Sequence, residues 1–137
     1  MTETEKFIVD TNIIFSALYK PVSNAGLLIE LALEGKIELY GPEKVREELM
    51  KNLKEKLMMN NIEIDAILQG LPLTWLDRTL YENFMRKAQK LISDKDASFL
   101  AAHFLTKYPI ITGDKEFSNI KGIKIYKLRE IIDKFVK

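Results

Sequence analysis

Four acidic residues stand where carboxylates often do chemistry. Asp10 and Asp114 each come just after an apolar run, Glu48 lies within a long helical pattern, and Asp96 opens a later one. Carboxylates held close together repel, which raises their pKa values unless a cation neutralises them. Mg²⁺ or Mn²⁺ gives that neutralisation and can activate water against a phosphodiester. The pattern therefore favours residues that are scattered in the sequence but converge on one hard cation.

Each of these residues also has a local structural explanation. Asp10 precedes Thr11 and can simply cap the following helix. The segment Ser93–Asp96 has the Ser-x-x-acid form of a capping box, and Asp114 fits an ordinary turn. Glu48, taken alone, is a common kind of helix glutamate. The joint occurrence of the four acids, rather than any single one, favours a site.

The composition restricts the metal chemistry further. The chain has 137 residues, no cysteine and one histidine, His103. Disulfides, thiolate metal sites and multi-histidine zinc sites are therefore excluded, and a bound metal must be a hard cation with oxygen ligands. A hydrophobic fraction of 47% fits one folded domain, which we expect to span residues 1–137.

Charge and hydropathy indicate the setting in which the protein works. No run of eighteen apolar residues exists and the first residues lack a secretory signal, so we expect a cytoplasmic protein without a membrane span. The 21 basic and 20 acidic residues leave a net charge of +1, so binding to a nucleic acid would need a local basic patch. A cysteine-free chain rich in Lys and Glu suits a thermophilic or archaeal source.

Apolar periodicity gives the elements that must position the four acids. Strands are predicted at 7–9, 37–40, 109–112 and 123–128. Helices are predicted at 13–18, 24–34, 42–57, 64–71, 84–91, 93–105 and 131–135. This alternation predicts a parallel sheet covered by helices on both faces, whose ligands bind beyond the carboxyl ends of the strands. The pattern would place Asp10 and Asp114 together at that edge.

Four segments of the chain resemble the acidic blocks of the PIN-domain nucleases, in the family's order. They are Phe7–Asn12, Gly41–Leu49, Asp94–Ala102 and Ile110–Phe117 with its Thr-Gly-Asp turn. The resemblance implies a three-layer α/β/α fold with a central, mostly parallel sheet of four or five strands. It also implies a Mg²⁺- or Mn²⁺-dependent endoribonuclease that hydrolyses single-stranded RNA, usually as a homodimer.

The same resemblance implies roles for individual residues. The metal ligands, which bind one or two ions, would be Asp10, Glu48, Asp96 and Asp114. Auxiliary groups that orient the carboxylates, bind a phosphate or act through water would be Asn12, Thr112, Glu116 and Asp94. Within the family, both a VapC-type toxin with a small antitoxin partner and an RNA-processing nuclease remain open.

Two pairs of neighbouring acids compete for one role. Glu48 is three residues after Val45 and shares its side of the helix, whereas Glu47 points away, so we choose Glu48. The family pattern selects Asp96, and Asp94 then serves as a helix cap with an auxiliary role. His103 lies on the apolar side of its helix and is interpreted as a core or interface residue.

Three other functions were weighed. The chain can be a catalytically silent PIN domain that binds RNA or acts as a scaffold, or a receiver-like module without turnover. Clustered carboxylates argue against a pure binder of polyanions. A Mg²⁺-dependent phosphatase with Asp10 as nucleophile would have a second Asp at position 12, where Asn12 stands. The RNA target is not predicted, although the region from Asn60 to Phe84 is where specificity would be sought.

Overall fold

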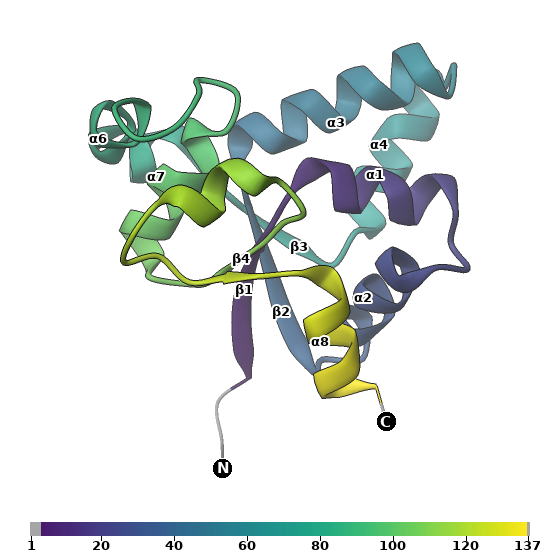
Figure 1. Cartoon of the computed structure of the whole chain (residues 1–137). Helices are drawn as coiled ribbons and strands as arrows, with labels where there is room; N and C mark the ends of the chain where they lie inside the picture. The colour runs from purple at the N-terminus through teal and green to yellow at the C-terminus, as the bar shows by residue number, and fades with distance from the viewer. Residues whose placement is uncertain (1–3, 137) are drawn as a thin grey trace.

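The computed structural model, which describes residues 4–136, has a central sheet of five strands (Figure 1). The strand order is β3-β2-β1-β4-β5, and every neighbouring pair is parallel. The strands are β1 Glu5–Val9, β2 Ile37–Pro42, β3 Leu73–Leu76, β4 Ile110–Ile111 and β5 Ile125–Tyr126. The predicted parallel sheet is thus confirmed.

The chain reverses its direction of travel across the sheet between β1 and β4. It moves outward from β1 through β2 to β3, and then returns to the other side of β1 with β4 and β5. In open parallel sheets such a reversal leaves a crevice at the carboxyl ends of the two strands, because the connections that follow them lead away in opposite directions. The crevice between β1 and β4 is therefore where a ligand site is expected.

Helices cover both faces of the sheet, as the alternating pattern predicted (Figure 1). On one side α2 packs against α8, and on the other α7 packs against α5, α6 and strand β2. The helices are α1 Thr11–Tyr19, α2 Asn24–Leu33, α3 Glu43–Lys56, α4 Asn61–Gly70, α5 Arg78–Tyr81, α6 Met85–Gln89, α7 Ala97–Thr106 and α8 Leu128–Phe135. Two 3₁₀ turns, Glu82–Phe84 and Lys115–Asn119, complete the described secondary structure.

The central strand is buried on both faces, which explains its continuous apolar sequence. Phe7, Ile8 and Val9 are all fully buried, as expected of a strand covered by helices on two sides. Helix α3 instead has a single buried stripe formed by Val45, Leu49 and Leu53. The remaining faces of α3 are free to carry polar residues toward the crevice.

Local signals fix where α2 begins. Ser23 is its N-cap, and its Oγ accepts a hydrogen bond of 3.1 Å from the backbone N–H of Gly26. A Cβ at Gly26 would lie 1.8 Å from the carbonyl oxygen of Pro21, so only glycine allows this close approach. The turn between α1 and α2 is therefore tight, and it places the start of α2 beside α1.

Four expectations about the elements need correction. Strand β3 was not predicted, and Pro42 is the last residue of β2 rather than the first of α3. The predicted helix at 84–91 is divided into a 3₁₀ turn and the short α6. The predicted helix at 93–105 begins only at Ala97, because Ser93 bonds to Glu116 rather than capping it. None of the described helices is long and apolar enough to cross a membrane.

Candidate active site

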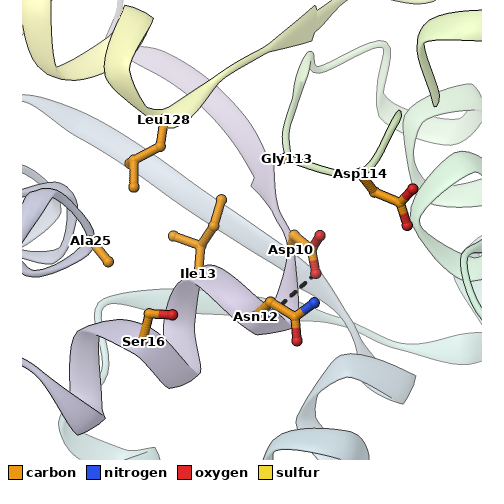
Figure 2. Close-up of a pocket in the computed structure, with 8 residues that line it drawn as sticks. All are labelled: Asp10, Asn12, Ile13, Ser16, Ala25, Gly113, Asp114 and Leu128. Carbon is orange, nitrogen blue, oxygen red and sulfur yellow. Dashed lines mark hydrogen bonds between the residues drawn. The ribbon is translucent and has the colours of Figure 1, made fainter. Parts of the chain in front are cut away.

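Asp10 and Asp114 follow the adjacent strands β1 and β4 and line the same pocket at the crevice between them, although Asp10 does not belong to the compact carboxylate group described below. The Asp10 side chain is 8% exposed, and each of its oxygens accepts one hydrogen bond. Oδ1 accepts from the backbone N–H of Asn12 at 3.1 Å, which caps α1 (Figure 2). Oδ2 accepts from the hydroxyl of Thr112 at 2.8 Å. Asp10 therefore has the capping role that its sequence context predicted, but its second oxygen is directed to β4.

Thr112 connects the two strand-end aspartates. Its side chain is buried, its hydroxyl donates to Asp10 Oδ2, and its oxygen accepts the backbone N–H of Asp114 at 3.0 Å. The two bonds use the donor and one acceptor position of the hydroxyl, so its orientation is fixed. The prediction that Thr112 orients the carboxylates agrees with this geometry.

A compact group of three carboxylates lies beside this pair. Asp96, Asp114 and Glu116 each offer an oxygen, and these oxygens lie within 4.8 Å of one another. The Asp114 side chain is itself held by the backbone N–H of Glu116 at 3.0 Å. Glu116 is fixed by Ser93, whose backbone N–H and hydroxyl donate to its two oxygens at 3.2 and 3.1 Å. Glu116 thus belongs to the compact group, a closer association than the water-mediated role predicted for it.

The electrostatics of this group are those of carboxylates that need a cation or a proton. Asp96 is 3% exposed, and burial, followed by its hydrogen bonds and repulsion with Asp114 and Glu116, raises its pKa to about 8. The backbone N–H of Glu116, followed by the hydrogen bond with Asp96 and the charge of Lys95, lowers the pKa of Asp114. Without a metal, these effects favour the protonated form of Asp96 and the charged form of Asp114.

One oxygen of Asp96 makes the need for a partner explicit. Oδ2 is buried and has no hydrogen-bond donor among the described residues. A buried, unpartnered carboxylate oxygen is strongly unfavourable, because desolvation is not offset. Two kinds of group relieve this, a proton shared with Asp114 or a cation among the three acids. An all-oxygen set of carboxylates suits Mg²⁺ or Mn²⁺, so the residues present fit a hard divalent ion.

Glu48 reaches the same crevice from α3. A pocket of about 350 Å³ is lined by residues that include Asp10, Glu48 and Asp96. Glu48 Oε2 accepts a hydrogen bond of 3.3 Å from the hydroxyl of the buried Thr11. Glu48 does not belong to the compact group of three, although it lines the same pocket as Asp96. Sequence reasoning did not identify Thr11, although its place directly after Asp10 put it within reach.

A second pocket opens on the other side of Asp10. It has a volume of about 320 Å³, and Figure 2 shows Asp10, Asn12 and Asp114 at one end. The exposed side chain of Asn12 lines both this pocket and the one beside Glu48. The predicted auxiliary residue Asn12 therefore lies at the junction of the two pockets.

Three lysines line the pocket at the acidic crevice. They provide positive charge close to the site, although the net charge of the whole chain is only +1. Lys51, Lys56 and Lys95 line the pocket that holds Asp10 and Glu48. Two of them come from α3, and Lys95 directly precedes Asp96. The lysines therefore lie on the same pocket as three of the predicted acidic residues, Asp10, Glu48 and Asp96.

Three further residues do not belong to the compact group of carboxylates. Glu47 is exposed and pairs with Arg78 at 3.9 Å, which agrees with the choice of Glu48. Asp94 is exposed and does not cap α7, whose N-cap residue is Asp96. The capping role predicted for Asp94 is therefore wrong. His103 is buried, with Nδ1 donating to the carbonyl oxygen of Tyr108 at 2.7 Å, as expected of a core histidine.

Comparisons with solved structures show how widely this architecture is shared. A chain in the crystal structure of VapBC2 from Rickettsia felis bound to a DNA fragment from their promoter is similar, with a TM-score of 0.65 at 20% identity. The match covers 89% of this chain and 98% of that chain. A chain in the crystal structure of DNA-bound VapBC from Salmonella typhimurium has a TM-score of 0.70 at 18% identity, covering 90% of this chain and 98% of that chain.

Sequence comparison defines the family. No curated protein is significantly similar in sequence to this chain. The family model described as PIN domain nevertheless matches residues 8–135, which include all four predicted acidic positions and nearly the whole of the fold. Together with the parallel sheet and the crevice at β1 and β4, this match shows that the chain belongs to the PIN-domain family.

Proposed function

We propose that the protein is a Mg²⁺- or Mn²⁺-dependent endoribonuclease that hydrolyses phosphodiester bonds of single-stranded RNA. The observation that carries the proposal is the buried oxygen of Asp96, which lacks a donor and lies in a group with Asp114 and Glu116. A proton or a cation can offset the cost of this oxygen, and the three carboxylate oxygens within 4.8 Å of one another are the ligands that a hard divalent cation prefers. Membership of the PIN-domain family supports the assignment of a nuclease.

The proposed metal ligands come from different elements around the crevice. Asp96 and Asp114 would hold the ion with Asp10, and Glu48 would face it from α3, either directly or through water. When bound, the ion would lower the pKa of a water molecule and stabilise the charge that develops on the attacking and leaving oxygens. Thr112 and Thr11 keep Asp10 and Glu48 in place by their hydrogen bonds.

The remaining polar groups suit a phosphodiester substrate. Lys51, Lys56 and Lys95 surround the pocket and can neutralise the phosphates on either side of the reacting bond. Asn12 is exposed at the junction of the two pockets, where its amide can donate to a phosphate oxygen. Because His103 is buried and bonded to Tyr108, no histidine in the described chain can act as a general base at this site.

The structural relatives support a proposal for the biological setting. The two similar chains come from VapBC structures bound to DNA. By analogy, we propose a toxin-like, cytoplasmic nuclease that is restrained by a small antitoxin protein and assembles as a homodimer. The test is to purify the chain alone and after co-expression with any small reading frame that lies directly upstream. Size-exclusion chromatography with light scattering then shows whether the chain binds the upstream product and whether it forms a homodimer.

The experiment that tests the nuclease function uses a fluorophore- and quencher-labelled single-stranded RNA. We expect cleavage in Mg²⁺ or Mn²⁺, none in EDTA, and recovery when the ion is returned. The Asp10→Asn variant should be inactive although it keeps the fold. Binding of RNA without cleavage under every metal condition would instead support the alternative, a catalytically silent PIN domain that binds RNA.

A further inference from the structure

An apolar pocket of about 400 Å³ adjoins the candidate active site beside α1 and α2. It shares Ser16, Ala25 and Leu128 with the pocket that contains Asp10 and Asp114. Figure 2 shows these three residues at the end of that pocket opposite Asp114. One continuous surface therefore leads from the carboxylates into the apolar pocket.

Two stacked aromatic rings form a wall of this apolar pocket. Phe15 and Tyr19 are one helical turn apart on α1, and their rings lie 6.3 Å apart with planes inclined by only 8°. Tyr19 is 69% exposed, although large aromatic side chains normally gain by burial. A ring face held in this way, open to solvent beside a candidate active site, is suited to stacking with a planar ligand.

The charges around these rings favour an anionic ligand. Lys56 Nζ lies 5.4 Å from the centroid of the Phe15 ring, and Lys20 lines the pocket. No acidic residue is among those that line it in the described part of the chain. Lys56 also lines the pocket that holds Asp10 and Glu48, so one lysine lies between the rings and the carboxylates.

An aromatic face next to a cation is the combination that binds single-stranded nucleic acids. Bases stack on the ring whatever their sequence, while the lysine neutralises the neighbouring phosphate. Because the phosphodiester must lie at the carboxylates, the next nucleotide of the same strand would reach this surface. An apolar protein segment could use the rings, but it would not require the lysine that joins the two pockets.

We infer that Phe15, Tyr19 and Lys56 form a nucleotide-binding subsite for single-stranded RNA. It holds the base of a nucleotide that neighbours the reacting phosphodiester, and Lys56 contacts the phosphate between them. These are positioning residues, since none of them touches the reacting atoms. The inference rests on the proposed function, because it takes the carboxylate site to be where the RNA strand is cut.

The test is RNA affinity measured by fluorescence anisotropy in Mg²⁺, in the Asp10→Asn background so that the strand stays intact. Tyr19→Ala should weaken binding by about 5- to 150-fold, the range expected for the loss of one stacked base. Tyr19→Phe should bind normally, because the ring remains. Val22→Ala is the control, since Val22 is exposed but does not line this pocket.

A scan with abasic RNA separates stacking from a general structural effect. If the subsite exists, an RNA that is abasic at one particular position will bind to wild type and to Tyr19→Ala with equal affinity. The base that would stack on Tyr19 is missing from that RNA. Lys56→Ala should lower the salt dependence of binding by about one ion, whereas the control Lys36→Ala should not. Lys36 lies next to Glu34 and lines a different pocket.

Two results would overturn the inference. One is a Tyr19→Ala variant that binds every abasic RNA more weakly than wild type does, by the same factor at every position. That result would show that Tyr19 only supports the fold. The other is unchanged RNA affinity in Tyr19→Ala with loss of an oligomer by light scattering, which would assign the rings to a second copy of the chain. Failure of the nuclease proposal would look different. Wild type would then bind RNA with the expected dependence on the abasic position but would not cleave it.

Discussion

Three aspartates follow strands of the same sheet and have the same local role, yet only two of them line a common pocket. In Asp10, Asp77 and Asp114, Oδ1 accepts the backbone N–H two residues ahead at 3.0 to 3.2 Å. Each therefore caps the turn or helix that follows it. Asp77 stands after the edge strand β3 and is exposed, whereas the other two stand after the adjacent strands β1 and β4.

The comparison shows that place in the sheet, rather than local sequence, distinguishes a site residue from a cap. Between β1 and β4 the connections diverge, so the second oxygen of Asp10 can reach Thr112 and Asp114 can reach Asp96. At β3 the chain continues directly into α5, and Asp77 has no other carboxylate of the candidate site near it. Asp77 is therefore a natural control for the other two.

The largest effect is expected from removing a charge at the crevice. Asp10→Asn should reduce RNA cleavage by at least about 100-fold, because stabilisation by the ion is worth several kcal/mol. Asp77→Asn should leave the cleavage rate unchanged and should lower stability only slightly, by weakening the N-cap of α5. Initial rates at saturating Mn²⁺ measure both. Equal losses in the two variants would remove the distinction between site and cap.

A smaller loss is expected when the link between the two strand-end aspartates is cut. Thr112→Val keeps the shape but leaves Asp10 Oδ2 and the backbone N–H of Asp114 without their partner. Activity should fall by about 10- to 100-fold and stability by about 1–3 kcal/mol. Thr112→Ser, which retains the hydroxyl, should recover most of the activity in the same assay. If Ser behaves like Val, the hydroxyl does not orient the carboxylates.

The helix α3 offers a matched pair of neighbouring glutamates. Glu48→Gln should lower kcat by about tenfold, because Glu48 faces the pocket and is held by Thr11. Glu47→Gln should change kcat little, since Glu47 makes only an exposed ion pair with Arg78. Steady-state kinetics on one RNA distinguish them. A larger loss in Glu47→Gln would reverse the assignment.

A further effect is expected on the pH dependence of stability without metal. Burial raises the pKa of Asp96 to about 8 from an ordinary value of 3.8, so the folded state binds the extra proton between these values. Stability should therefore fall as pH rises from about 4 to about 8, and then level off. The lowered pKa of Asp114 acts only at more acidic pH.

Thermal melts in EDTA at several pH values measure this slope. Asp96→Asn should flatten it and melt higher than wild type near pH 8, because its amide has no charge to bury. Asp77→Asn should follow the wild-type curve. A wild-type melting temperature that rises between these pH values would show that Asp96 is ionised in the metal-free fold.

Sequence patterns predicted the parts of this molecule that depend on periodicity. The predicted strand at 7–9 lies within β1, and the predicted helix at 42–57 matches α3 to within one residue at each end. They could be predicted because each depends on residues close in the sequence. Strand β3 was missed because Leu73–Leu76 is a short edge strand whose pairing with β2 is set by tertiary contacts.

Contacts between distant segments account for what sequence reasoning missed at the site. The pairing of Ser93 with Glu116 spans 23 residues, so the Ser93–Asp96 segment looked like a capping box although it is not one. The same pairing brings Glu116 into the compact group. Lys95 and Thr11 were also missed, because a lysine or threonine beside an acid is common and only the fold shows which of them face the crevice.

Carboxylates at the crevice between β1 and β4 are proposed to bind one hard cation together. Titration of the metal-free protein with Mn²⁺ by isothermal calorimetry at about pH 7.5 tests this directly. We predict that wild type and Asp77→Asn bind Mn²⁺ with the same Kd, and that Asp96→Asn and Asp114→Asn bind it at least about tenfold more weakly. Unchanged Mn²⁺ affinity in both of those variants would contradict the account.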